Sequence, residues 1–162
     1  MRINILKPGD LAKANKLVHL DKGKTGGQEG DPLEMLIFNL TIHHLWGRVL
    51  TKFPEARAIT YADDGYIKTK LSIALQVLAE LKAVFKEDAG LELNVAKTSI
   101  LPKGTTAQAA FNMAQTIMQA TPSLAHLAND LLVDSFCPEG FIGIGVPIGT
   151  DAFCTEFCRE KM

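Results

Sequence analysis

Apolar residues recur at the spacing of a helix face in the segment that follows Asp31. They are Leu33, Leu36, Ile37, Leu40 and Trp46. Asp31 can accept hydrogen bonds from the free amide groups of a first turn, and Pro32 suits the first helical position because it has no amide hydrogen. Glu34 can complete a reciprocal cap. The pattern predicts a helix that begins at Asp31 and ends before Pro54.

A β-hairpin is predicted over residues 57 to 69. The segment ARAITYADDGYIKT contains two short β-rich runs on either side of Asp-Gly, a pair that favours tight turns. A second helix follows, and Gly90 can end it in a left-handed conformation. Its apolar face consists of Leu71, Leu75, Leu78, Leu81 and Phe85. After Gly90, the alternating sequence LELNVAKTSIL predicts an extended segment.

The last third of the chain predicts two more helices, near residues 105 to 119 and 122 to 133, the second capped by Thr121 with a proline at its first position. FIGIGVPIG, at 141 to 149, is a glycine-containing strand candidate. A short helix should begin near Thr150, with Phe153 and Phe157 on one face. Helices mixed with antiparallel hairpins predict an α+β fold.

Composition indicates a folded protein rather than a disordered or membrane-spanning one. The chain has 162 residues, of which 47% are apolar and 22% charged. No apolar run reaches the ~18 residues that a membrane span requires. The N-terminus has only a four-residue apolar stretch, too short for a signal peptide, so we expect an intracellular protein, whether nuclear or cytoplasmic.

Net charge and cysteine spacing count against two classes of protein, nucleic-acid binders and zinc fingers. A net charge of -1 counts against a free-standing nucleic-acid binder, although the N-terminal segment is basic. Such a segment is more often solvated surface than a phosphate contact. Cys137, Cys154 and Cys158 lack a histidine partner at zinc-finger spacing, so we expect reduced, buried thiols.

The candidate chemistry lies at Asp63 and Asp64. At the tip of a tight hairpin, two neighbouring carboxylates can both reach one hard cation, which favours Mg²⁺. The alternative is an ordinary solvated turn, because acidic residues and glycine are common in turns. The residues around Asp63 and Asp64 help to decide between a metal site and a solvated turn.

Three segments occur in a fixed order: GGQEGDPLEMLIFNL at 26 to 40, YADDG at 61 to 65 and GLELNVAKT at 90 to 98. Together they resemble motifs B, C and D of a reverse transcriptase palm domain, in particular of the non-LTR retroelement type. The resemblance covers residues 24 to 103, and GVPIGTDAF is similar to a segment that follows the palm in some retroelement proteins. It implies a palm-like α+β fold with a YADD hairpin backed by helices. The expected division is then a basic N-terminal segment (1–23), the palm (24–103) and a helical C-terminal extension (104–162).

The resemblance implies nucleotide and template contacts at Gly30, Asp31 and Pro32, where a helix N-terminus favours a triphosphate. Tyr61 and Ala62 match residues beside the primer terminus, where an aromatic face packs and a small residue gives clearance. Each also has a plain structural interpretation. The motif B residues could simply cap a helix, and Tyr61 could be a buried strand tyrosine.

The resemblance further implies that Asp63 and Asp64 are catalytic metal ligands for two Mg²⁺ ions. Lys97 matches the motif D lysine, which the family is thought to use as a proton donor to pyrophosphate, a role suited to a cation near developing negative charge. Without the resemblance, Lys97 would be interpreted as a surface residue. The implied partners are an RNA template, a DNA primer and deoxynucleotides.

Two features of the family have no counterpart in the sequence. Neither Asp10 nor Asp21 lies in a hydrophobic strand of the kind that carries the motif A aspartate, and the fingers have no room upstream. Glu29 also stands where the family has glutamine, which would weaken triphosphate binding. We therefore expect a fragment of an RNA-directed DNA polymerase that is inactive alone. The alternative is a non-catalytic retroelement remnant, and a viral RNA polymerase is disfavoured because Ala62 stands where those enzymes more often have glycine.

Overall fold

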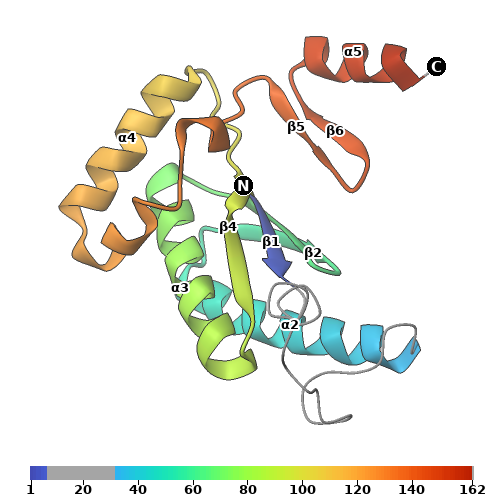
Figure 1. The fold of residues 1–162 in the computed structure, drawn as a ribbon, viewed down its shortest axis with the longest axis vertical. Coiled ribbons are helices and arrows are strands. Elements are labelled where there is room, and N and C mark those ends of the chain that lie inside the picture. The colour runs from blue at the N-terminus through green and yellow to red at the C-terminus, as the bar shows by residue number, and fades with distance from the viewer. Residues whose placement is uncertain (7–31, 162) are drawn as a thin grey trace, which may run out of the picture.

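The computed structural model describes residues 1–6 and 32–161. The first part forms a β-α-β-β-α-β unit, in which α3 runs alongside β4 (Figure 1). The elements of this unit are β1 (Arg2–Leu6), α2 (Pro32–Lys52), β2 (Arg57–Tyr61), β3 (Asp64–Lys68), α3 (Leu71–Ala89) and β4 (Glu92–Ser99). The α+β class predicted from the sequence is confirmed.

The four strands form one antiparallel sheet in the order β2-β3-β1-β4. β1 pairs with β3 on one side and with β4 on the other. Among the described residues, this strand order, with α2 between β1 and β2 and α3 between β3 and β4, matches the split βαβ or ferredoxin-like arrangement. The sequence had not predicted a strand ahead of α2. The five residues RINIL are too short a run to be recognised as a strand before their partners are known.

Local sequence signals fixed most element boundaries in this unit. α2 begins at Pro32 and ends at Lys52, before Pro54 as predicted, whereas the predicted cap Asp31 lies outside the described residues. The β2–β3 hairpin falls within the predicted range. α3 ends at Ala89 and is capped by Gly90, whose φ of 61° is the left-handed conformation that glycine adopts at low cost.

A single hydrophobic core joins α2 and α3 to one face of the sheet. Val49 of α2, Leu78 of α3 and Val95 of β4 are buried in it. The core continues into the C-terminal part, where Met118 and Phe136 belong to the same cluster. The proposed boundary between residues 103 and 104 stays a prediction, and core residues lie on both of its sides.

In the first half of α2, the apolar residues whose spacing predicted the helix are not buried. Its four leading apolar residues are between 55% and 63% exposed. They are Leu33, Leu36, Ile37 and Leu40. Ile42, Leu45 and Trp46 contact the core instead, and Figure 1 shows the N-terminal end of α2 extending away from α3. No helix within residues 1–6 and 32–161 has the length and apolar character needed to cross a membrane.

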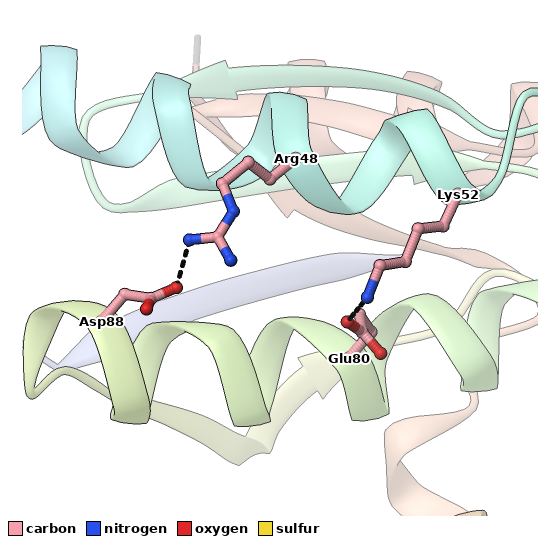
Figure 2. A network of polar contacts seen from close by, with 4 residues as sticks. All are labelled: Arg48, Lys52, Glu80 and Asp88. Atoms are coloured by element: carbon pink, nitrogen blue, oxygen red, sulfur yellow. Dashed lines mark hydrogen bonds and ion pairs between the residues drawn. The ribbon is translucent and has the colours of Figure 1, made fainter.

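Two ion pairs join the solvent side of α2 to α3 (Figure 2). Arg48 pairs with Asp88, and Lys52 pairs with Glu80. Both pairs are partly exposed, so each contributes at most about 1 kcal/mol. The helix pair therefore depends mainly on the apolar core between the two helices.

The C-terminal part contains α4 (Ala107–Ala120), which Thr106 caps by accepting a 3.2 Å hydrogen bond from Ala109 N. The predicted α-helix over 122 to 133 is wrong. Pro122–Leu127 forms a short 3-10 helix, η1, and Val133–Ser135 forms another, η2. Leu124 and Leu127 are both buried, and a three-residue spacing aligns side chains along a 3-10 helix.

The predicted single strand over 141 to 149 is a hairpin. β5 (Gly140–Gly143) pairs with β6 (Val146–Gly149) around Ile144 and Gly145, whose φ values are 52° and 74°. Positive φ at both central residues is the requirement of a type I′ turn, and Gly145 meets it at low cost. α5 (Asp151–Lys161) follows as predicted, with Phe153 and Phe157 both half-buried.

The expectation of buried thiols is wrong. Cys158 is exposed, whereas Cys137 and Cys154 are half-buried, and all three are free. Burial raises the pKa of the Cys137 thiol, a hydrogen bond with Ser99 opposes that change, and the nearby carboxylate of Asp134 adds to it.

Candidate active site at the tip of the central hairpin

The β2–β3 hairpin turns through Ala62 and Asp63, because Tyr61 and Asp64 form the last pair of the ladder. Ala62 has a φ of 50°, in the left-handed region that residues with a side chain rarely adopt. The prediction that Asp-Gly forms the turn is therefore wrong, since Asp64 and Gly65 begin β3. Asp63 lies in the turn, and Asp64 is the first strand residue.

Gly65 belongs in the strand because Trp46 of α2 covers it. A Cβ built at Gly65 would lie 2.2 Å from Cζ2 of the indole, a distance that real Cβ atoms do not reach. The glycine therefore allows α2 to approach the hairpin closely. This contact also fixes which face of β3 points toward the helices.

The opposite face of β3 carries Asp64, Tyr66 and Lys68, since successive strand residues alternate between faces. Tyr61 lies directly across from Asp64 and is 64% exposed. The interpretation of Tyr61 as a buried strand tyrosine is therefore wrong. Tyr61 and Asp64 form an accessible pair at the end of the hairpin.

Both candidate carboxylates are half-buried. The Tyr66 hydroxyl donates a 3.1 Å hydrogen bond to Oδ2 of Asp64. The Tyr66 ring in turn stacks on Phe141 of β5, with centroids 6.4 Å apart and planes inclined by 11°. Sequence reasoning missed Tyr66, although its position two residues after Asp64 on a strand was the available signal.

Asp63 and Asp64 can contribute ligands to one hard cation. Mg²⁺ in proteins is commonly bound by one or two carboxylates, with water and substrate phosphates completing its octahedral shell. The two adjacent, half-buried carboxylates fit that requirement for one ion. Carboxylates for a second ion would have to come from another strand.

β1 is the strand beside the carboxylate pair. Its residue Asn4 pairs with Asp64 in the register of β3 and with Asn94 in the register of β4. Directly paired residues of antiparallel strands have Cα atoms about 4.5 to 5.5 Å apart. Position 4 is thus the nearest position on β1 to the second aspartate, and the sequence of β1, RINIL, contains no carboxylate.

Lys97 lies on β4, at the far side of β1 from the hairpin. Arg2 pairs with Ser99 and Asn4 with Asn94, so β4 has additional residues in a bulge that includes Lys97. Oδ1 of Asn94 accepts a 3.3 Å hydrogen bond from the Lys97 amide. The Lys97 side chain is exposed, and its strand lies two strand spacings, about 10 Å, from β3.

Only some of the motif B residues are among those that the structure describes. Pro32 is the first residue of α2, whereas Gly30 and Asp31 lie outside the described residues, as does Glu29. Figure 1 shows the N-terminal end of α2 and the β2–β3 hairpin extending to the same side of the view. The order of the motifs predicts that Lys97 and this helix end face the same side as Asp63 and Asp64, and this stays a prediction.

Comparisons of the chain with protein-family models, with curated proteins and with solved structures found no match.

Proposed function

We propose that the chain is a reverse-transcriptase-like palm element, a fragment of a template-directed, Mg²⁺-dependent RNA-directed DNA polymerase. The observation that carries the proposal is the position of Asp63 and Asp64 at the tip of a hairpin whose second strand pairs with the central strand β1. The β-α-β-β-α-β order of the described elements supports it, because it places YADDG, GLELNVAKT and residues 32–40 of the third segment on one sheet and its helices. The assignment of a polymerase reaction rests on the resemblance of three ordered segments to motifs B, C and D: GGQEGDPLEMLIFNL, YADDG and GLELNVAKT.

In this proposal, Asp63 and Asp64 hold Mg²⁺, and Tyr66 orients Asp64 through its hydroxyl. The ion would activate a primer hydroxyl and stabilise the departing pyrophosphate. Tyr61 offers an exposed ring beside Asp64 for the terminal base pair of the primer. Lys97 would donate a proton only if a bound nucleotide bridged the distance from β4 to the hairpin.

The position of Asn4 supports a fragment that is inactive alone. Two-metal phosphoryl transfer needs carboxylates on both sides of the reacting phosphate, and one hairpin tip leaves the second ion short of ligands. The position on β1 closest to Asp64 is an asparagine. The same observation favours the alternative function, a non-catalytic remnant that acts as a binding or structural module.

Magnesium titration of the purified chain by calorimetry tests the metal site. We expect weak binding that Asp63→Ala with Asp64→Ala abolishes, while Asp151→Ala with Glu156→Ala, an equal loss of exposed carboxylates in α5, leaves it unchanged. Magnesium binding that survives the loss of Asp63 and Asp64 would contradict the palm proposal.

Primer extension tests whether the fragment is active alone. With an RNA template, a DNA primer, Mg²⁺ or Mn²⁺ and four deoxynucleotides, we expect no extension. Extension that disappears in the Asp63→Ala, Asp64→Ala variant would support the polymerase and reject the statement that the fragment is inactive.

A further inference from the structure

The outer edge of β2 carries backbone groups that no neighbouring strand pairs with among the residues that the structure describes. The register of the sheet shows which groups these are. Ile67 of β3 turns away from β2, because its amide donates to the Met1 carbonyl and its own carbonyl accepts from the Met1 amino group, each at 2.9 Å. Its ladder partner Ala58 therefore points its N–H and C=O outward, since bonding direction alternates along an antiparallel pair. Thr60, two residues farther along β2, does the same.

The face of β2 that points away from the helices carries three exposed side chains. They are Arg57, Ile59 and Tyr61. Ile59 is 72% exposed and Tyr61 is 64% exposed, the two highest values among the large hydrophobic residues of the described chain. On β3, by contrast, Tyr66 is covered by the stacked ring of Phe141. The open part of this face therefore belongs to the edge strand.

We infer that β2 pairs antiparallel with β2 of a second copy of the chain, around a two-fold axis at Ile59. In this register Ala58 lies across from Thr60 of the partner subunit, and the symmetry repeats that pair. Each pair can exchange two hydrogen bonds, because both of its residues point their backbone groups outward. A register shifted by two residues would keep only one such pair within β2. The backbone therefore favours the register centred on Ile59.

The same register also matches the exposed side chains to one another. Ile59 meets the partner's Ile59 at a non-hydrogen-bonded position, where side chains of paired strands approach most closely. Arg57 lies across from the partner's Tyr61, and the two-fold axis repeats this pair on the other side. A guanidinium over an aromatic ring is an attractive contact. Arg57 forms no ion pair with a described residue, which leaves it available for this contact. The strand is thus complementary to itself, and this complementarity favours a second copy as the occupant.

The inference goes beyond the proposed polymerase function, because it needs neither magnesium nor nucleic acid. In the dimer, the partner's Arg57 would cover the ring of Tyr61. A primer and a second copy would therefore compete for Tyr61. Two five-residue strands joined at their edges bury little surface, so we expect a weak dimer.

Sedimentation velocity tests the inference on the full chain, at protein concentrations from about 10 μM to about 1 mM, where weak association is measurable. The chain should pass from monomer to dimer as its concentration rises. Thr60→Pro should weaken dimerisation at least about tenfold, because it removes the outward N–H from both copies. It leaves the pairing of β2 with β3 intact, since proline is tolerated where the N–H of an edge strand faces solvent. Thr60→Val keeps the amide and should dimerise as the unmodified chain does.

An exchange of side chains tests the register. Tyr61→Arg sets two guanidinium groups across from each other and should weaken dimerisation at least about tenfold. Adding Arg57→Tyr to that variant restores a ring across from a guanidinium and should restore the dimer. No other register of β2 predicts this recovery.

A lysine at the two-fold axis tests the apolar centre of the interface. Ile59→Lys places two like charges directly across from each other and should leave the chain monomeric. Met113→Lys is the matched control, because Met113 is 55% exposed on α4 and lies outside β2. It should dimerise as the unmodified chain does. Circular dichroism checks that each variant is folded.

A chain that stays monomeric over the whole concentration range would overturn the inference. So would equal effects of Ile59→Lys and Met113→Lys, or an exchange of residues 57 and 61 that fails to restore the dimer. A dimer that Leu36→Asp disrupts and Ile59→Lys does not would also overturn it, because the interface would then lie on the exposed apolar face of α2. Dimerisation without magnesium binding would retain this inference and reject the palm proposal, whereas magnesium binding by a chain that stays monomeric would do the reverse.

Discussion

The indole of Trp46 lies against Gly65, so that a Cβ at Gly65 would be 2.2 Å from Cζ2 and 2.8 Å from Cη2 of the ring. Trp46 is in the middle of α2, and Gly65 is the residue after Asp64. The contact therefore fixes the hairpin on α2 next to the candidate carboxylates. It also explains why glycine stands at a strand position where it supplies no turn.

Gly65→Ala should destabilise the protein by about 1 to 3 kcal/mol, because the added methyl group overpacks the contact with Trp46. Urea unfolding measures the change. Gly47→Ala is the matched control, since a Cβ at Gly47 meets nothing within 4 Å. Alanine in a helix interior should stabilise by about 0.5 to 1 kcal/mol. Equal effects of the two substitutions would contradict the contact.

The stacking of Tyr66 on Phe141 should contribute to stability by holding the β5–β6 hairpin against the sheet. A double-mutant cycle with Tyr66→Ala and Phe141→Ala should give a coupling of about 0.5 to 1.5 kcal/mol. Tyr66→Phe removes only the hydroxyl bonded to Asp64 and should keep the coupling. Strictly additive alanine effects would show that the two rings do not interact in solution.

Asn4→Asp should increase magnesium affinity about tenfold, because it places another negative charge near the ion. Two unit charges about 4 Å apart attract each other by ~1 kcal/mol in water, and by more where water is partly excluded. The reason is the register that pairs position 4 with Asp64. Asn94→Asp makes the same chemical change one strand farther from Asp64 and should have a much smaller effect. Calorimetric titration compares the two. Comparable gains from both substitutions would argue that only net charge matters.

Cys137 should react with iodoacetamide more slowly than Cys158 at pH 8. Burial raises the pKa of the Cys137 thiol, so less of it is thiolate, whereas Cys158 is exposed on α5. The rate at Cys137 should keep rising as the pH increases above 9. Peptide mass spectrometry follows each site, and unfolding in urea should bring the two rates together. Faster labelling of Cys137 in the folded chain would contradict its burial.

The sequence by itself determined the elements whose signals are local. The apolar spacing before Gly90 predicted α3, because helix period and a left-handed C-cap depend on neighbouring residues only. The two β-rich runs in ARAITYADDGYIKT predicted the central hairpin within its correct range. Asp63 and Asp64 were likewise identified as candidate metal ligands from neighbouring residues alone, and that role stays a prediction.

Only the tertiary structure decided where the hairpin turns, which strand lies beside the carboxylates and which face of α2 is buried. Gly65 is a strand residue because Trp46, nineteen positions earlier, occupies the space of a side chain. β1 becomes a strand only when β3 and β4 supply its hydrogen-bond partners. Such choices depend on contacts between residues far apart in the sequence, and periodicity and capping carry no information about those contacts.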